Sequence, residues 1–149
     1  MNPQVTIRRA NPSEHALVRK IVQTVVDETY GGIWAKPPLV IDEEDWSRAS
    51  VAVGNHELLG MMLTEQDWVS DLWVLRPFRN IGVGGLLLEQ AETEIAGRQH
   101  LTGRLRVVSF NTRAQTFYKR HGWTVRREFP HEKLPISMIE MAKTLRVSP

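Results

Sequence analysis

The stretch Asp71–Leu88, which reads DLWVLRPFRNIGVGGLLL, decides the fold of this chain. It begins with a strand-like apolar run and stops at Pro77, which cannot donate to a sheet ladder. Arg79 and three closely spaced glycines follow, and then comes an amphipathic run of helix-forming residues. This order places an amide-rich turn at the positive end of a helix, where anions bind readily. The sequence therefore predicts a strand, an anion-binding turn and a helix in succession.

The composition is that of one soluble globular domain, which we expect to span residues 1–149. Hydrophobic residues make up 42% of the chain and charged residues 24%. The chain has no cysteine, which excludes disulfides, thiolate metal sites and a cysteine nucleophile. The N-terminal residues lack the apolar core of a signal peptide, and no apolar run is long enough to span a membrane. We therefore expect a cytoplasmic protein without a membrane partner.

The charges of the chain divide unevenly between its two halves. Residues 1–75 carry 6 Lys and Arg against 11 Asp and Glu, whereas residues 76–149 carry 13 against 6. A basic half suits a polyanionic ligand and an acidic half a cationic one, although a chance distribution over solvated surfaces gives the same counts.

The hydrophobic periodicity predicts an α/β fold with a mixed, mostly antiparallel sheet of six or seven strands and about four helices. The expected order is β-α-α-β-β-β-α-β-α-β-β. Expected strands are Val5–Arg9, Ser50–Val53, Leu58–Thr64, Trp68–Leu75, Leu105–Ser109, Trp123–Phe129 and Ile136–Leu145. Expected helices are 11–30, Glu43–Arg48, 82–97 and one that opens at a Thr112-x-x-Gln115 capping box and ends at Gly122.

Two helices show a clear apolar face. In the first, we expect Leu17, Ile21, Val22 and Val25 to face the core, with Asn11 and Glu14 forming a capping box at its start. In the helix after the glycines, the expected apolar stripe is Leu87, Leu88, Ala91 and Ile95.

The glycine turn does not fit the common nucleotide-binding motifs. It lacks the Gly-Lys-Ser/Thr end of a P-loop, and Leu87 stands where a dinucleotide fingerprint has its third glycine. On its own, the turn is also compatible with glycines that serve only tight packing.

Two motifs in order make the turn more specific. Arg79-x-x-Gly82-x-Gly84 opens the helix, and Asn111 after the next strand precedes Phe117-Tyr118-x-x-x-Gly122-Trp123. The chain thereby resembles the GNAT superfamily of acetyl-CoA-dependent N-acetyltransferases, sharply over about residues 58–125. The resemblance implies an acyltransferase that moves the acetyl group from acetyl-CoA to a primary amine of a small molecule or peptide, by direct attack in a ternary complex.

The resemblance also implies a coenzyme A site. The pyrophosphate would lie on the backbone amides of the turn, with the charge of Arg79 nearby, and the pantetheine arm would pair with the strand end where the fourth and fifth strands splay. Asn80 in place of the usual glycine still tolerates a left-handed backbone, while Ile81 removes a phosphate contact that a basic residue makes elsewhere. The implied cofactor-binding residues are Val74, Leu75, Arg79, Asn80, Ile81, Gly82, Val83, Gly84, Gly85, Asn111, Phe117 and Tyr118.

For the chemistry, the resemblance implies Tyr118 as the proton donor to the leaving thiolate. The backbone amide of Val74 or Leu75 would polarise the thioester carbonyl. Asp71 is our choice for the base that takes the proton of the amine, with Asp67 and Glu65 as alternatives and a water as a further one.

We expect the acceptor amine near residues 30–46 and 129–136. The implied acceptor-binding residues are Tyr30, Trp34, Asp71 and Trp73. Trp46 and Phe129 are further candidate walls, and the acidic run 42–45 would attract a cation. The five histidines show no metal-ligand spacing, so we expect no metal.

Other functions stay open at this point. One is a non-catalytic module of the same fold that binds an acyl-CoA or a partner. Another is nucleic-acid binding, which the pI of about 9.2 and the pair Arg126-Arg127 prompt, although no basic helix or aromatic-basic alternation supports a nucleic-acid partner. A homodimer through the C-terminal strands is common in such families and is one expectation here.

Overall fold

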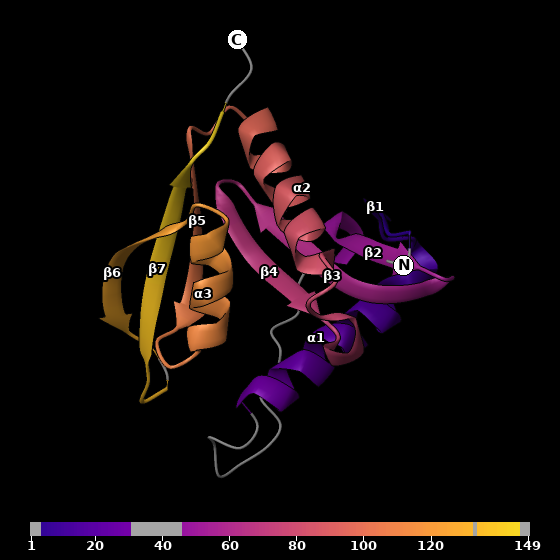
Figure 1. Ribbon diagram of the computed structural model, residues 1–149, viewed down its shortest axis with the longest axis horizontal. Helices are drawn as coiled ribbons and strands as arrows, with labels where there is room; N and C mark the ends of the chain where they lie inside the picture. The colour runs from indigo at the N-terminus through magenta and orange to yellow at the C-terminus, as the bar shows by residue number, and fades with distance from the viewer. Residues whose placement is uncertain (1–3, 31–45, 133, 147–149) are drawn as a thin grey trace. The chain divides into compact units, whose positions relative to one another are not determined.

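The computed structural model describes residues 4–30, 46–132 and 134–146. Within these residues, seven strands and three α-helices follow one another along the chain (Figure 1). The strands are β1 (Thr6–Arg9), β2 (Ser50–Gly54), β3 (Glu57–Glu65), β4 (Trp68–Val74), β5 (Thr102–Val108), β6 (Thr124–Pro130) and β7 (Ser137–Thr144). The helices are α1 (His15–Tyr30), α2 (Val83–Gly97) and α3 (Thr112–Arg120), with short 3-10 turns η1 (Pro12–Glu14), η2 (Trp46–Arg48) and η3 (Arg76–Phe78).

The strands form one sheet in the order β1-β2-β3-β4-β5-β7-β6. The β1–β2, β2–β3, β5–β7 and β6–β7 pairs are antiparallel, whereas β4 pairs in parallel with β5 through Trp68 and Arg104. The predicted mixed α/β fold with a mostly antiparallel sheet of seven strands is confirmed. Of the predicted helix over Glu43–Arg48, only Trp46–Arg48 lies in the described part, where it is a 3-10 turn.

The contacts of the chain group into two compact units. One comprises the described residues up to Thr64 together with Asp71–Ala91, and the other Glu65–Ser70 together with those from Glu92 onward. The single domain expected over residues 1–149 stays a prediction.

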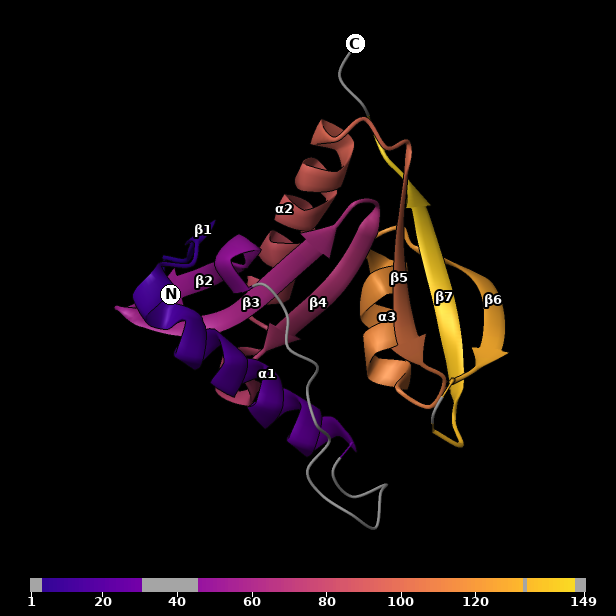
Figure 2. The same ribbon diagram turned by 180° about the vertical axis from the view of Figure 1, so that it is seen from behind.

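In the first unit, α1 covers one face of the sheet and the start of α2 the other (Figures 1 and 2). A hairpin turn joins the antiparallel strands β2 and β3, with Asn55 and His56 in left-handed backbone at φ of +50° and +64°. Gly60 of β3 allows a close approach of α2, because a Cβ there would lie 3.2 Å from Leu87 Cδ1 and 2.7 Å from the Trp73 carbonyl oxygen.

The predicted apolar face of α1 is confirmed at Ile21, Val22 and Val25 and wrong at Leu17. Leu17 is 52% exposed, and Val18 is fully buried in its place. The buried positions Val18, Ile21, Val22 and Val25 follow the i, i+3, i+4, i+7 spacing of one helix face, which Leu17 does not. This face packs against Val51, Met61 and Leu63 of the sheet.

The predicted capping box before α1 is present, on a 3-10 turn rather than on the α-helix itself. The Asn11 backbone N–H donates to Glu14 Oε1 at 2.8 Å. Arg8 of β1 donates to both carboxylate oxygens of Glu14, at 2.8 and 2.9 Å. These bonds lower the pKa of Glu14 to about 2, with the Arg8 bond as the largest cause.

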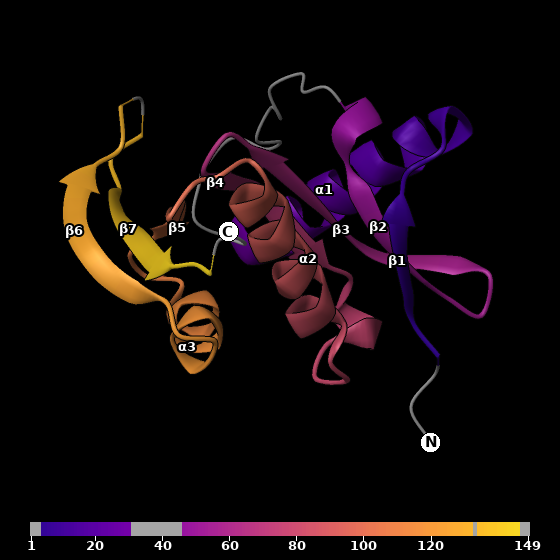
Figure 3. The ribbon, with the colours of Figure 1, turned by 90° about the horizontal axis from the view of Figure 1, so that it is seen from above.

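In the second unit, α3 lies on one face of β5, β7 and β6 (Figure 3). Gly103 of β5 leaves room for the Trp123 indole, because a Cβ there would lie 3.0 Å from that ring. Glu92 of α2 ties the layers together, since its carboxylate accepts from Lys143 Nζ at 2.7 Å and from Trp123 Nε1 at 3.2 Å.

The start of α3 differs from the prediction. The capping residue is Asn111, whose Oδ1 accepts from the Ala114 N–H at 3.2 Å, and Thr112 is already the first helical residue. Gln115, expected to close the capping box, instead donates to the Ser109 carbonyl at 2.8 Å. Asparagine caps a helix at least as well as threonine, so the cap moves one residue earlier. At the other end, Gly122 has φ of +89°, as a helix-ending glycine should.

The strand β6 ends the sheet. All of its residues except Phe129 are exposed, and Arg126 and Arg127 stand in its middle. Its one neighbouring strand is β7.

Candidate functional site

The glycine turn of the first unit has the geometry of an anion cradle. Asn80 and Gly82 have φ of +65° and +92°, so the left-handed backbone expected at Asn80 is present. The helix α2 begins at Val83, and the Leu86 N–H donates to the Gly82 carbonyl at 3.2 Å. The amides of the preceding first turn have no acceptor within the helix and face its N-terminal end. A Cβ built on Gly82 would meet nothing within 4 Å, so the space over the turn is open.

Arg79 holds this turn to the rest of the first unit. Its Nε donates to the Val74 carbonyl at 2.9 Å, and its Nη2 lies 3.4 Å from Glu28 of α1. The side chain is only 17% exposed. Arg79 therefore positions the turn against β4 and α1, a role that the motif did not reveal because Glu28 is 51 residues away.

The end of β4 offers one edge for a ligand. The Leu75 N–H donates to the Leu59 carbonyl of β3 at 3.0 Å. Because successive residues of a strand direct their backbone groups to opposite edges, the N–H and carbonyl of Val74 face away from β3. Of the two amides expected to polarise the thioester, that of Leu75 is engaged within the sheet, which leaves Val74 as the better candidate.

Asp71 lies buried in β4, with 8% of its surface exposed. Its Oδ1 accepts from Trp73 Nε1 at 2.9 Å, so the two side chains share a face of the strand, as predicted. Trp73 in turn packs against the core cluster on the α1 side. The indole therefore fixes the orientation of the carboxylate.

The two alternative bases are less suitable. Asp67 accepts from Arg104 Nε at 2.7 Å and from Nη2 at 3.1 Å, and this hydrogen bonding to Arg104 lowers the pKa of Asp67. A carboxylate with a lowered pKa that is already held by a guanidinium takes up a proton poorly. Glu65 is exposed at the end of β3.

The second motif lies on α3 in the second unit. Asn111 caps the helix, and Tyr118 is buried, with 8% of its surface exposed. The ring of Tyr118 makes edge contacts with Phe117 and Trp123, with centroids 5.2 and 6.2 Å apart. The expected cofactor residues thus divide between the two units.

The expected acceptor residues lie in different environments. Tyr30 and Trp46 are each 8% exposed, and Trp46 belongs to the core cluster. Trp34 and the acidic run 42–45 lie outside the described residues. Phe129 lines a cleft of about 540 Å³ at the β6–β7 connection, within the predicted segment 129–136.

Sequence reasoning also missed a row of arginines and aromatic rings in the second unit. Its members come from β4, β5 and β6: Trp68, Arg104, Arg106, Arg127 and Phe129. No sequence signal links them, because only the strand pairing brings these segments together.

Two further findings concern the part of the chain that the structure describes. There, no group of three or more His, Cys, Asp or Glu residues is arranged to hold a metal ion. No described helix is both long and apolar enough to cross a membrane.

Comparison with known proteins decides the family. Residues 40–145 match the family model of the acetyltransferase (GNAT) domain. The chain belongs to the GNAT acetyltransferase family. GNAT enzymes are acyltransferases that use acetyl-CoA, so the resemblance drawn from the two motifs is confirmed. No curated protein is a significant match to this GNAT sequence.

Solved structures share the GNAT fold over almost their full length. Ard1 from Thermoplasma volcanium is 19% identical with a TM-score of 0.75, covering 95% of this chain and 98% of that one. The ribosomal-protein-S18-alanine N-acetyltransferase from Escherichia coli is 16% identical with a TM-score of 0.68, and the match covers 98% of this chain and 97% of that one. A chain of the NatC complex bound to Gag peptide and CoA is 13% identical with a TM-score of 0.71, and the match covers 96% of this chain and 99% of that one. At these identities the likeness shows the fold.

Proposed function

We propose that this protein is an N-acetyltransferase that moves the acetyl group of acetyl-CoA to a primary amine of a small molecule or peptide. The observation that carries the proposal is the cradle at the start of α2, where Asn80 and Gly82 adopt left-handed backbone beneath open space. Membership of the GNAT family and the similar fold of the CoA-bound NatC complex support coenzyme A as the anion.

The residues of the cradle suit the pyrophosphate of coenzyme A. The first-turn amides of α2, from Val83 to Gly85, would donate to phosphate oxygens at the positive end of the helix. Arg79 would hold the turn in place through Val74 while adding positive charge. The outward N–H of Val74 suits a carbonyl of the pantetheine arm, which would add like a short strand, while the Val74 carbonyl already accepts from Arg79 Nε. Asn111 and Phe117 would contact the same arm from the second motif.

Acetyl-CoA supplies a thioester whose carbonyl carbon accepts the amine. A lysine-like amine has a pKa of about 10.4, so it arrives protonated and must first lose a proton. Asp71 would take that proton, directly or through a water. The amine nitrogen then forms a bond to the carbonyl carbon while the Val74 amide stabilises the oxygen.

The carbon–sulfur bond breaks next, and the electron pair leaves on sulfur. The nitrogen would lose its second proton to solvent, and Tyr118 would donate its hydroxyl proton to the sulfur and recover a proton from solvent. Once Asp71 releases the first proton, the products are the N-acetyl amine, free CoA and one released proton. The chain has no cysteine, which agrees with direct attack rather than a thioester intermediate on the enzyme.

Isothermal titration with acetyl-CoA tests the cofactor site, with ATP as the comparison ligand. Gly84→Glu places a negative charge in the first turn of α2, where the helix dipole tolerates it but phosphates are repelled. Gly97→Glu is the matched control at the other end of the same helix, where a Cβ meets nothing within 4 Å. We expect micromolar binding to wild type and to Gly97→Glu, and none to Gly84→Glu. Absence of binding to wild type would remove the proposal.

Turnover of Tyr118→Phe tests the donor. Loss of the hydroxyl should lower kcat by about a hundredfold or more while the KM for acetyl-CoA changes little. An unchanged kcat would assign Tyr118 to packing alone. Acetyl-CoA binding without transfer to any amine in a library would favour the non-catalytic acyl-CoA sensor.

A further inference from the structure

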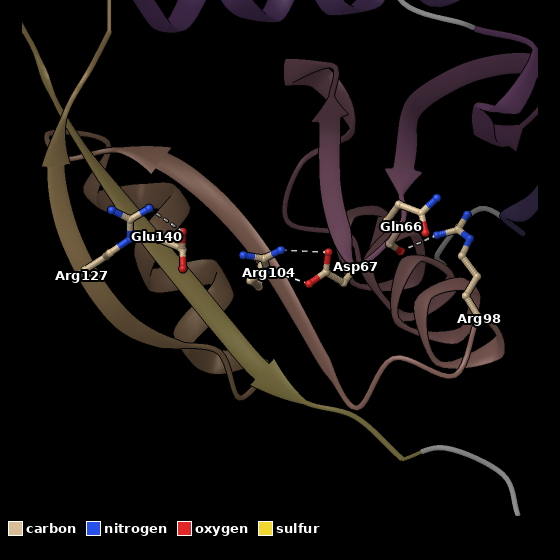
Figure 4. A network of polar contacts seen from close by, with 6 residues as sticks. All are labelled: Gln66, Asp67, Arg98, Arg104, Arg127 and Glu140. Atoms are coloured by element: carbon tan, nitrogen blue, oxygen red, sulfur yellow. Dashed lines mark hydrogen bonds and ion pairs between the residues drawn. The ribbon is translucent and has the colours of Figure 1, made fainter.

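The arginine–aromatic row crosses the open face of the sheet in the second unit. Gly103 points toward Trp123 on the helical side, and strand alternation therefore turns Arg104 and Arg106 to the other face. Figure 4 shows Arg104, Glu140 and Arg127 on the side of the strands away from α3.

Each ring of the row lies between two guanidinium groups. Trp68 has Arg104 Cζ at 4.1 Å and Arg106 Cζ at 4.6 Å from its ring centroid. Phe129 has Arg127 Cζ at 4.4 Å and Arg106 Cζ at 5.4 Å. Arg106 is therefore the central member, held by cation–π contacts to both rings although it is exposed.

The two outer arginines, Arg104 and Arg127, each have a carboxylate partner. Arg104 is bound by Asp67 at 2.7 Å, and Arg127 Nη2 lies 3.2 Å from Glu140 Oε1. Glu140 also stands opposite Arg106 in the β5–β7 ladder. Within residues 4–30, 46–132 and 134–146, however, no carboxylate forms an ion pair or hydrogen bond with Arg106.

The row thus carries one uncompensated positive charge, from three arginines against two carboxylates. A single carboxylate balances that charge, and its planar shape matches the fork of a guanidinium. A nucleic acid fits less well, because base binding needs open aromatic faces and these rings are covered by arginines.

Arg106 lines one cleft and contacts a residue that lines another. The first cleft, of about 270 Å³, is lined by Trp68, Val69, Ser70 and Arg106. Arg106 also contacts Phe129, which lines the cleft of about 540 Å³.

We propose that Arg106 binds a carboxylate of the acceptor, so that the preferred acceptors are amines that also carry a carboxylate, such as amino acids or short peptides with a free C-terminus. This inference rests on the proposed acetyl transfer for its biological meaning. The carboxylate site itself is testable without it.

The first experiment measures binding without turnover. N-acetylglycine and its uncharged amide are titrated separately, and the Trp68 indole N–H and Arg106 Nε–H resonances are followed by NMR. The carboxylate should shift both resonances, with the amide binding about tenfold or more weakly. Arg106→Gln should abolish the difference at Trp68, whereas Arg126→Gln, which removes an exposed charge of β6, should retain it.

Equal shifts with the two compounds, or an unchanged preference in Arg106→Gln, would overturn the inference. So would salt-dependent binding of an oligonucleotide that is lost in Arg106→Gln, since the site would then serve nucleic acid. Thermal unfolding of each variant checks that the fold is intact, and Arg106→Lys should keep part of the preference through its charge.

The second experiment measures turnover with free amino acids and their C-terminal amides. Arg106→Gln should raise the KM for the carboxylates about ten- to hundredfold and leave kcat and the amides unchanged. A wild type that acetylates both sets equally would contradict the carboxylate site while leaving the acetyltransferase intact. A wild type that binds no acetyl-CoA would remove the proposed function, and the NMR titration would still decide the role of Arg106.

Discussion

Arg79 Nε donates to the carbonyl oxygen of Val74 across 2.9 Å, so the basic residue of the glycine turn holds the end of the strand that precedes it. Both residues belong to the expected coenzyme A site. The bond therefore couples the position of the phosphate cradle to the strand edge offered to pantetheine.

Loss of this bond should weaken acetyl-CoA binding. We expect Arg79→Leu to raise the dissociation constant about tenfold or more, because a hydrogen bond from a charged group contributes roughly 1.5–3 kcal/mol. Glu28→Gln is the matched control, since it removes only the partly exposed ion pair at 3.4 Å and should change affinity less than about threefold. Isothermal titration measures the dissociation constant of acetyl-CoA for both variants. If both variants weaken binding equally, the Arg79–Glu28 ion pair rather than the bond to Val74 would account for the role of Arg79.

The left-handed backbone at Gly82 should make this position intolerant of a side chain. Gly82→Ala should lower the free energy of unfolding by about 1 kcal/mol or more, since φ is +92° although no atom blocks the Cβ. Gly97→Ala, also with open space around the Cβ, should be neutral or slightly stabilising. Urea denaturation compares the two, and a neutral Gly82→Ala would contradict the turn geometry.

Glu14 should make the stability of the protein depend on pH. Its pKa falls from 4.5 to about 2 on folding, so its contribution is complete above about pH 4.5 and is lost as the pH falls toward 2. Glu14→Gln should lower the free energy of unfolding by about 1 kcal/mol at pH 7, a value discounted because solvent screens the Arg8 pair. The difference between variant and wild type should vanish near pH 2. A difference that persists there would exclude the ion pair as its cause.

The two aspartates of the β3–β4 region should respond differently to removal of their charge. Asp71→Asn should reduce kcat by about a hundredfold or more, the usual contribution of a general base. Asp67→Asn should leave kcat within about threefold, because the Asp67 carboxylate is bound by Arg104 and its pKa is lowered. The measurement is kcat of both variants as a function of pH. Normal activity of Asp71→Asn across the whole pH range would eliminate Asp71 as the base.

Asn111 and Thr112 should contribute differently to stability, because Asn111 caps α3 and Thr112 does not. Asn111→Ala should lower the free energy of unfolding by about 1 kcal/mol, since it removes the acceptor of the Ala114 N–H. Thr112→Ala should cost less than about 0.5 kcal/mol because Thr112 is the first residue inside the helix. Reversed effects in thermal unfolding would restore the capping box predicted from the sequence.

Local patterns predicted much of the fold. The strand, glycine turn and helix of residues 71–97 follow from a proline stop, left-handed positions and an apolar stripe whose four members are all fully buried. Local signals are weaker where neighbouring residues compete for one role. Leu17 and Val18 are both apolar, and Asn111 and Thr112 are both capping residues, so only packing and geometry decide between them.

The contacts of the site with large sequence separation could not be predicted in this way. Glu28 meets Arg79 through the packing of α1, and Arg106 meets Trp68 and Phe129 through strand pairing. Neither contact leaves a periodic trace in the chain. The family motifs indicate the expected cofactor residues of each unit, whereas the proposed carboxylate site depends on strand pairing.

The exposed strand β6 bears on how copies of this protein meet. An end strand presents unpaired backbone groups that invite another strand to continue the sheet. Two copies joined antiparallel with Arg127 opposite Arg127 would bring two like charges together, which repel across the strands, whereas Arg126 of each copy would face Glu128 of the other. The charge of Arg127 therefore opposes self-pairing in that one register, and an acidic residue opposite Arg127 would favour pairing.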